Sequence, residues 1–193
     1  GMADEVEIDR AVETIRSTGN EQIVILHCVS VYPTPADQLN LNKITTLAEK
    51  YDFPIGFSDH SAGITAALGA RALGASVLEK HFTLDCTMPG PDHWFSSDPQ
   101  ELRDLVKQVR LLEDGLGSGA LAPSAGEIEM RLLARRSIVA AHELAENHLI
   151  TDEDLVFLRP GTGLMPYECA SVIGRKTRNI IPAGTRLHPD MLE

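Results

Sequence analysis

The sequence predicts an α/β fold: the C-terminal part of a TIM-type (β/α)8 barrel, followed by a small β-rich module. Helix-like and strand-like segments alternate over residues 4–112 with short connections, which is typical of parallel β/α units. Short strand-like pieces with tight turns follow residue 135. Because a closed barrel needs about 250 residues, this chain of 193 residues is expected to contain only the last three β/α units of one.

The expected helices and strands are identified by the spacing of apolar residues. Apolar residues at helical spacing predict helices, and continuous apolar or β-branched runs predict buried strands. Ser97 is expected to cap a fourth helix that has Pro99 in its first turn. The first three predicted helices span residues 4–18, 39–51 and 63–74, and the predicted strands span residues 22–28, 54–60 and 76–83.

The sequence changes character after the fourth helix. The stretch DGLGSGALAPSAG (114–126) is rich in glycine, proline and small residues, as linkers are. We therefore expect a partial barrel over residues 1–116, a linker over 117–134 and the β-rich module over 135–193. Within the module, NHLITDEDL (147–155) aligns with GTRLHPDML (184–192) at an offset of 37, which indicates either pseudo-twofold symmetry or a chance similarity.

The composition excludes several classes of partner. Lys and Arg total 17 against 28 Asp and Glu, a formal charge of -11, which argues against nucleic acid or an anionic membrane as a partner. The three cysteines form no C-x-x-C pair, which fits a reducing compartment. No apolar run marks a signal peptide or could span a bilayer, so a cytoplasmic location is expected.

Two of the predicted strands end on a histidine. Side chains alternate between the faces of a strand, so Ser58 and His60 share one face while Asp59 points the other way, and Glu79 shares a face with His81. The carboxyl ends of adjacent barrel strands meet at one rim, so the two imidazoles are expected to converge there. Two imidazoles with a nearby carboxylate suit Mn²⁺, Co²⁺, Fe²⁺ or Zn²⁺. The alternative is that both histidines are hydrogen-bonded structural residues.

Two loops are candidates for further parts of a site. MPGPDHW (88–94) presents Asp92 at the rim, either as a simple turn or as a lid over a polyhydroxylated substrate. RPGTG (159–163) is no phosphate-binding Walker loop, because it lacks the lysine-serine ending and a following helix. Ser58 is expected to donate a hydrogen bond to an anion at the start of the next helix.

Six ordered motifs together resemble the sialic acid (N-acetylneuraminate) synthase family. They are LHCVSVYPTP, IGFSDHSAGI, VLEKHFTLD, GPDH, ARRSIVA and LRPGTGL. The resemblance implies that residues 1–116 are the final strands of a synthase barrel and that residues 135–193 form a SAF domain, a β-clip module similar to type III antifreeze proteins. It also implies condensation of phosphoenolpyruvate with N-acetylmannosamine or a related hexose, giving a nine-carbon 2-keto acid and phosphate; the expected small-molecule partners are phosphoenolpyruvate and an N-acetylhexosamine.

The resemblance assigns roles to individual residues. His60 and His81 match the ligands of a divalent metal, expected to be Mn²⁺, with Mg²⁺ or Co²⁺ as alternatives. Ser58 matches a residue that contacts phosphoenolpyruvate. Glu79 is implied as a catalytic residue in proton transfer or hydroxyl binding, and Asp92 as a catalytic residue that also contacts the acceptor sugar.

Three further positions complete the implied site. Tyr32 matches a residue that contacts the acceptor sugar. Ser30 stands where the family often has asparagine, so the shorter side chain puts that substrate contact in doubt. Arg159 matches an arginine that reaches over the partner's active site in a domain-swapped homodimer.

The first five barrel strands of that family, with their phosphate-binding lysines, have no counterpart here, so little synthase activity is expected from this chain alone. Two alternatives stay open. One is a non-catalytic carbohydrate-binding or dimerisation fragment; the other is a different barrel enzyme that uses phosphoenolpyruvate, which leaves the SAF-like tail without a role.

Overall fold

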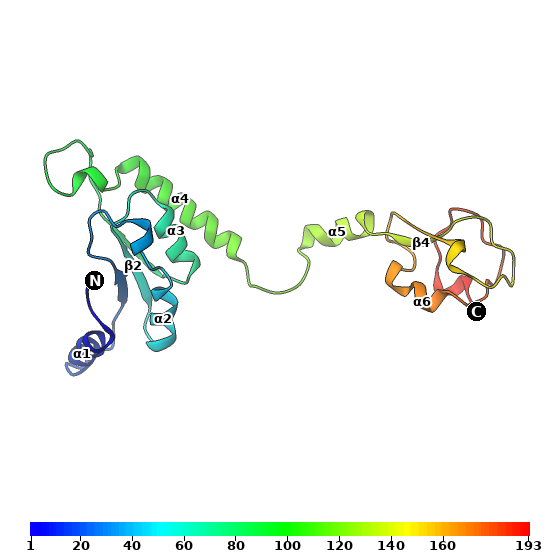
Figure 1. The fold of residues 1–193 in the computed structure, drawn as a ribbon, viewed down its shortest axis with the longest axis horizontal. Helices are drawn as coiled ribbons and strands as arrows, with labels where there is room; N and C mark the ends of the chain where they lie inside the picture. Colours follow the sequence, from blue (N-terminus) through cyan, green and yellow to red (C-terminus); the bar gives the residue numbers. More distant parts are fainter. The chain divides into compact units, whose positions relative to one another are not determined.

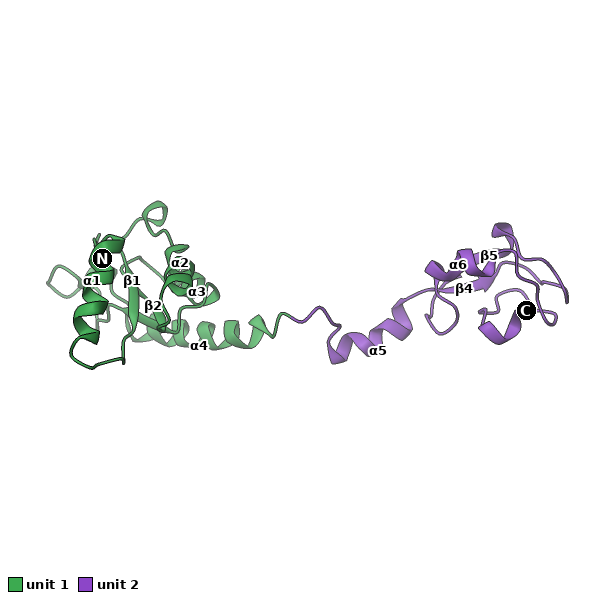
Figure 2. Ribbon diagram, turned by 90° about the horizontal axis from the view of Figure 1, so that it is seen from below, with its two compact units in different colours: residues 1–119 green, residues 120–193 purple.

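The computed structural model describes residues 1–193 and divides into two compact units, residues 1–119 and 120–193 (Figure 2). The first unit is an α/β unit in which three parallel strands form one sheet in the order β1-β2-β3. Its strands are β1 (Ile25–Cys28), β2 (Ile55–Asp59) and β3 (Val77–Lys80), and its helices are α1 (Glu5–Arg16), α2 (Lys43–Lys50), α3 (Thr65–Ala72) and α4 (Pro99–Leu116). Helices α2, α3 and α4 lie beside this sheet (Figure 1). Three parallel strands agree with the sequence analysis, whereas their membership of a closed barrel stays a prediction.

The sheet has one helix-covered face and one face without helices. β2 is buried along its whole length because it is the central strand. On the helix-covered face, Phe57 and Ile55 pack with Ile44 of α2 and with small alanines of α3. On the other face, Gly56 lies so close to Leu26 and Val77 that a Cβ atom would stand 2.4 Å from the Leu26 side chain. The face without helices is the one on which Ser58 lies, because side chains alternate along the strand.

The N-terminus of α4 differs from the prediction. Asp98, not Ser97, caps the helix: its Oδ1 accepts hydrogen bonds from the backbone N–H groups of Gln100 and Glu101, both at 2.8 Å. Ser97 is fully buried and instead pairs with the chain after β3, donating its N–H to the His81 carbonyl and accepting from the Thr83 N–H. A carboxylate is well suited to the cap because it also interacts favourably with the helix dipole.

The segment expected as a linker, 117–134, contains a helix. α5 (Ala125–Ala134) begins at Ser124, whose hydroxyl accepts from the Glu127 N–H while the Glu127 carboxylate accepts from the Ser124 N–H. This reciprocal capping box is a sequence signal for a helix N-terminus. The glycine- and proline-rich composition of the surrounding residues obscured it.

The second unit is a small β-rich module with pseudo-twofold symmetry. Its strands β4 (Ser137–Ala140) and β5 (Leu155–Leu158) pair antiparallel, and α6 (Cys169–Val172) completes its regular elements. The bridge between Val139 and Arg186 is repeated, with the roles of the two halves exchanged, by the bridge between Leu149 and Lys176. These positions are 37 apart in sequence, so the offset predicted from residues 147–155 and 184–192 is present in the hydrogen bonding.

Local conformation repeats at the same offset. Asn147 and Gly184 both have positive φ, 58° and 79°. Short 3₁₀ helices follow at matching positions, Asp152–Asp154 and Pro189–Met191. Ile150 and Leu187 are both buried in the core of the module. Pseudo-twofold symmetry, and not chance, therefore explains the similarity of the two segments.

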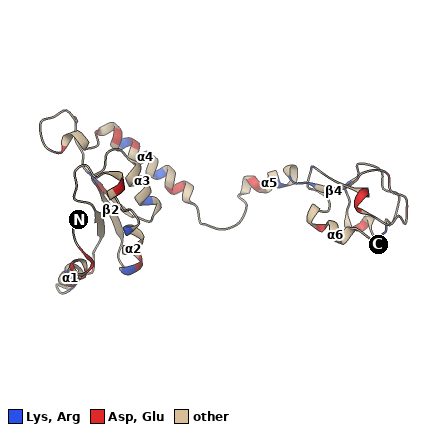
Figure 3. Ribbon diagram, viewed as in Figure 1, with Lys and Arg blue, Asp and Glu red and all other residues tan.

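Figure 3 shows acidic and basic residues interspersed along α4, with no stretch of one sign. Separately, no helix of the structure has both the length and the apolar character needed to cross a bilayer.

The repeated turn gives a prediction about stability. Replacing Gly184 with alanine should destabilise the module by roughly 1 kcal/mol, because a side chain disfavours the left-handed conformation. Asn147→Gly is the matched control and should cause no loss. Urea titration monitored by the amide signals of residues 137–193 measures both, and an unchanged midpoint for Gly184→Ala would contradict the expectation.

A buried carboxylate gives a second prediction. Burial acts to raise the pKa of Asp154, but hydrogen bonds from His148 and Thr151 lower it from 3.8 to about 2. A depressed folded-state pKa adds stability above the unfolded value, and this stability is lost as the pH falls from about 4 towards 2. The urea midpoint of the module should drop over that range. Asp154→Asn should remove this part of the drop, whereas Asp190→Asn, at an exposed position, should leave it intact.

Candidate functional site

The parallel register of β2 and β3 brings the two histidines together. Ser58 pairs with Glu79 and Asp59 pairs with Lys80, so His60 and His81 are the next residues to leave the strands side by side. Their ring centroids are 5.1 Å apart, with the rings nearly perpendicular at 84°. The structure therefore places both imidazoles at the carboxyl ends of adjacent strands.

The His60 ring is held in one tautomer. Its Nδ1 lies 2.8 Å from the backbone carbonyl of Val29, and a carbonyl oxygen can only accept a hydrogen bond, so Nδ1 carries the proton. The residue is only 7% exposed. Nε2 is therefore the nitrogen left with a free lone pair, and a backbone carbonyl on the other ring nitrogen is the arrangement commonly found around metal-bound histidine.

Aromatic side chains surround the histidine pair. Tyr32, from the segment after β1, lies against His60 with ring centroids 4.3 Å apart, and its ring is 5.9 Å from His81. Phe95, in the 3₁₀ helix His93–Phe95, packs with its ring centroid 5.1 Å from that of His81. Phe95 is buried whereas Tyr32 is half exposed, so the former supports the site and the latter is accessible from solvent.

Carboxylates and hydroxyls lie next to the imidazoles. Ser58 donates its hydroxyl proton to Glu79 Oε1 at 2.6 Å. Asp92 Oδ2 lies 3.9 Å from His81 Nδ1, too far for a direct hydrogen bond but close enough for electrostatic attraction to a protonated ring. Ser30 is half buried, with its hydroxyl 3.9 Å from the Cys28 sulfur.

The donors partly fit a divalent cation. His60 and His81 offer two imidazoles from adjacent strands, but no group of three His, Cys, Asp or Glu side chains is arranged to hold a metal. A cation here would need water or substrate oxygens at its other positions. Such incomplete protein coordination is usual where the metal acts on a substrate.

Arg159 belongs to the unit of residues 120–193. It is exposed and follows β5, at the start of RPGTG. The loop is fixed by buried Ser137, whose hydroxyl donates to the Pro160 carbonyl at 2.7 Å and accepts from the Gly163 N–H at 2.9 Å. Arg159 is therefore presented from a rigid loop.

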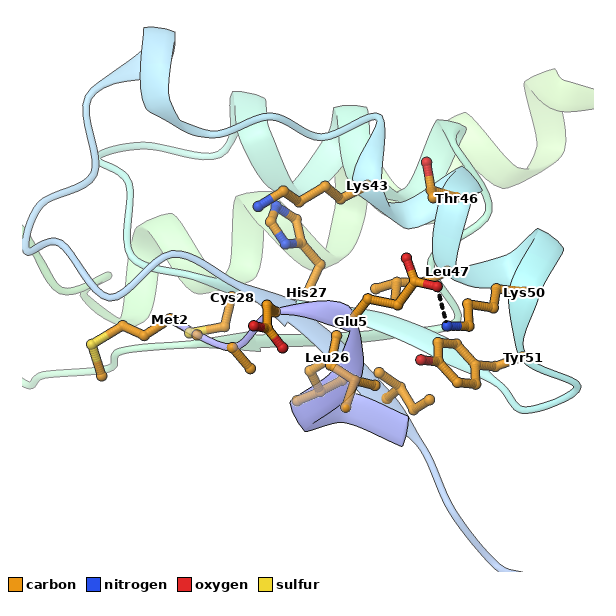
Figure 4. Close-up of a pocket in the computed structure, with 15 residues that line it drawn as sticks. Met2, Glu5, Leu26, His27, Cys28, Lys43, Thr46, Leu47, Lys50 and Tyr51 are labelled. Carbon is orange, nitrogen blue, oxygen red and sulfur yellow. Dashed lines mark hydrogen bonds and ion pairs between the residues drawn. The ribbon is translucent and has the colours of Figure 1, made fainter. Parts of the chain in front are cut away.

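A separate cavity of about 470 Å³ lies along β1 and α2 (Figure 4). Lys50 and Glu5 form an ion pair at its wall, and Met2, His27 and Cys28 line another part of it. None of the candidate site residues contributes to its lining. The cavity therefore excludes the histidine pair but adjoins it, because the sulfur of Cys28, which lines the cavity, lies 3.9 Å from His60 Nδ1.

Sequence reasoning missed three residues that lie next to the histidines. Asp59 and Lys80 form a buried ion pair directly before His60 and His81, and Phe95 packs on His81. The S-D-H and E-K-H triplets carried the signal for the ion pair, since an aspartate and a lysine precede the two histidines at equivalent strand positions. Nothing in the local sequence marks Phe95.

Comparison with known proteins gives two family matches. The NeuB family model matches residues 1–120 and the SAF domain model matches residues 135–193. The N,N'-diacetyllegionaminic acid synthase of Legionella pneumophila is 41% identical over 191 residues, which cover 97% of this chain and 54% of that protein. The human N-acetylneuraminate-9-phosphate synthase is 36% identical over 160 residues, covering 81% of this chain and 44% of that one.

A solved structure is similar as well. The N-acetylneuraminic acid (sialic acid) synthetase of Leptospira borgpetersenii, determined with citrate, superposes with a TM-score of 0.62 at 44% identity. The match covers 67% of this chain and 45% of that one. Across these comparisons, the chain spans about half the length of the relatives it matches.

Fold, site and comparisons together define the class of protein. A parallel α/β unit with paired histidines at its strand ends is followed by a SAF domain, and the curated relatives named above are synthases. The chain belongs to the NeuB family.

The packing around His81 gives a testable prediction. Phe95→Ala should destabilise the first unit by about 3 kcal/mol, because it removes a buried ring and leaves a cavity. The neighbouring Trp94 is 61% exposed, so Trp94→Ala should change stability by less than about 0.5 kcal/mol. Urea unfolding followed by amide signals of residues 1–119 separates the two, and equal losses would contradict this account.

Proposed function

We propose that this chain is the C-terminal part of the catalytic domain, with the SAF domain, of a nonulosonic acid synthase. The reaction is the condensation of phosphoenolpyruvate with N-acetylmannosamine or a related hexose, giving a nine-carbon 2-keto acid and phosphate. The observation that carries the proposal is the convergence of His60 and His81 at the strand ends. The names of the relatives, synthases of legionaminic acid and of N-acetylneuraminate 9-phosphate, support the substrate class.

His60 and His81 are proposed to hold a divalent cation, Mn²⁺ or alternatively Mg²⁺ or Co²⁺. Nε2 of His60 is the available nitrogen, because Nδ1 is committed to the Val29 carbonyl. When bound, the cation supplies Lewis-acid polarisation of the open-chain sugar aldehyde. The protein holds the ligating ring of His60 in place before any cation arrives, which lowers the entropic cost of binding.

Ser58 and Glu79 are proposed to act as a pair on phosphoenolpyruvate. The Ser58 hydroxyl donates its hydrogen bond to Glu79 in this structure, so donating to a carboxylate or phosphate oxygen requires the hydroxyl to turn away from Glu79. That rotation frees the Glu79 carboxylate to accept a proton, or to accept a hydrogen bond from a substrate hydroxyl. Contact with phosphoenolpyruvate and proton transfer are thereby coupled through one hydroxyl.

Tyr32 and Asp92 are proposed to bind the acceptor sugar, and Ser30 is proposed to contact substrate. Tyr32 is half exposed beside His60, where its ring can pack on the apolar C–H groups of a sugar. Asp92 is exposed near His81 and can accept hydrogen bonds from sugar hydroxyls. Its carboxylate is also the candidate to exchange a proton with the sugar oxygens. Ser30 can supply only a short-range hydroxyl contact.

Arg159 is proposed to act across a domain-swapped homodimer. Its guanidinium offers the fork of donors that carboxylates and phosphates accept. The RPGTG loop supports this role, because its two hydrogen bonds to Ser137 hold the backbone beside Arg159 in place, so less backbone entropy is lost on binding.

A non-catalytic carbohydrate-binding or dimerisation fragment is the second candidate. One observation favours it: only two protein ligands, His60 and His81, are available for a cation, since no group of three His, Cys, Asp or Glu side chains is arranged to hold one.

The test is calorimetric titration of the chain with Mn²⁺ and then with phosphoenolpyruvate. Mn²⁺ should bind, and the double variant His60→Ala, His81→Ala should weaken that binding by at least about tenfold, because both proposed ligands are removed. The control His188→Ala removes a histidine from the other unit and should bind Mn²⁺ as the unaltered chain does. Metal-independent binding of N-acetylmannosamine would favour the second candidate instead.

A further inference from the structure

The residues directly before the two histidines form a buried ion pair. Lys80 Nζ lies 3.0 Å from Asp59 Oδ2, and the side chains are 5% and 0% exposed. Both point to the helix-covered face of the sheet, opposite to Ser58 and Glu79, because alternate strand residues face opposite sides. The ion pair thus joins β2 to β3 one residue before His60 and His81 leave the strands.

The same pair fixes the residue that follows His60. Asp59 Oδ1 accepts from the Ser61 N–H at 2.8 Å and from its hydroxyl at 2.6 Å. Lys80 Nζ also donates to the Ser61 carbonyl at 2.7 Å. Both neighbours of His60 in the chain are therefore tied to Lys80, and the His60 carbonyl itself accepts from the Thr34 N–H at 3.0 Å.

The arrangement is poorly explained by stability alone. A buried ion pair must overcome the loss of hydration of two charges, and well-packed apolar residues of similar size often stabilise a protein as much or more. What the ion pair provides is a fixed geometry, because four polar contacts define one position for the turn after β2. The two strands that it joins are the two that carry the imidazoles.

We propose that Asp59, Lys80 and Ser61 are positioning residues that lock the backbone of His60 and the relative placement of His60 and His81. For the cation this inference rests on the proposed function, whereas the locked imidazole geometry can be tested without metal. Outer-shell partners of metal-binding histidines typically contribute 10–100-fold to affinity. We expect an effect of about tenfold here, because the lock acts through the backbone.

The experiment uses the double variant Asp59→Asn, Lys80→Met. It replaces the ion pair with neutral side chains of similar size, and the amide oxygen introduced by Asp59→Asn can still accept from the Ser61 N–H. Should that variant unfold, Asp59→Leu, Lys80→Met is the alternative, because replacing both partners leaves no unpaired charge in the core, whereas removing one alone would leave the other buried without a partner. Glu113→Gln is the matched control, since it breaks the half-buried Arg71–Glu113 ion pair between α3 and α4.

Two measurements are made on the full chain. Long-range ¹H–¹⁵N spectra of the metal-free protein report the imidazole tautomers. In the unaltered chain and in Glu113→Gln, His60 should appear as a fixed Nδ1–H tautomer with a slowly exchanging proton. In the double variant the His60 ring nitrogens should instead show chemical shifts averaged between the two tautomers. The amide spectrum should stay dispersed, which indicates that the chain is still folded. Cobalt titration followed by its visible spectrum should then show about tenfold weaker binding and an altered band shape.

The outcomes separate this inference from the proposed function. A fixed His60 tautomer that survives in a folded double variant, Asp59→Asn, Lys80→Met or Asp59→Leu, Lys80→Met, overturns the positioning role, whether or not cobalt binds. Averaging in the variants supports the positioning role even if the unaltered chain fails to bind cobalt. That failure would instead overturn the metal site. Loss of tautomer order in Glu113→Gln would also overturn the inference, because any lost ion pair would then suffice.

Discussion

The parallel pairing of β2 with β3 is the constraint on which the candidate site depends. Ser58 opposite Glu79 and Asp59 opposite Lys80 fix which residues emerge together at the strand ends. A slip of one residue would turn every side chain of one strand to the opposite face, and would separate His60 from His81. Gly56 allows this pairing to be close, since Leu26 and Val77 of the neighbouring strands fill the space that a side chain would take. The site is therefore specified by strand packing before any ligand is considered.

The two faces of the sheet divide structural and chemical tasks. Phe57, Ile55 and the alanines of α3 build the apolar core on one face, and the Asp59–Lys80 ion pair closes that face at its carboxyl end. Ser58 and Glu79 lie on the other face, where no helix covers them. Polar groups that must meet a substrate are thus kept out of the core, while the polar pair that stays in the core is hydrogen-bonded. This satisfies the general requirement that buried charges be paired.

Much of this arrangement could be predicted from the sequence, because strand periodicity is a local property. Alternation placed Ser58 with His60 and Glu79 with His81, and the structure brings both histidines to one rim. The prediction that Ser97 caps α4 was wrong, because Ser97 instead pairs with the chain after β3. That pairing depends on tertiary structure and leaves no signal in the local sequence. Phe95 was missed for the same reason: its contact with His81 depends on how the loop of residues 84–96 folds back. The pseudo-twofold offset was visible in residues 147–155 and 184–192. The equivalence of Val139, which bridges to Arg186, and Lys176, which bridges to Leu149, was not visible, since those two side chains have nothing in common.

The symmetry of the second unit separates the core and turn residues that its two halves share from the polar residues that differ between them. Positions 137 and 174 correspond under the offset of 37, yet Ser137 supplies the hydroxyl that holds the RPGTG loop, whereas Gly174 has no side chain with which to hold an equivalent loop. Asp154 and His148 likewise form a hydrogen-bonded pair whose counterparts are Met191 and Thr185. The shared features, Ile150 with Leu187 and Asn147 with Gly184, are core and turn residues. Each half thus keeps its own turn and core residue, while the Ser137 hydroxyl, which has no counterpart, holds the loop that carries Arg159.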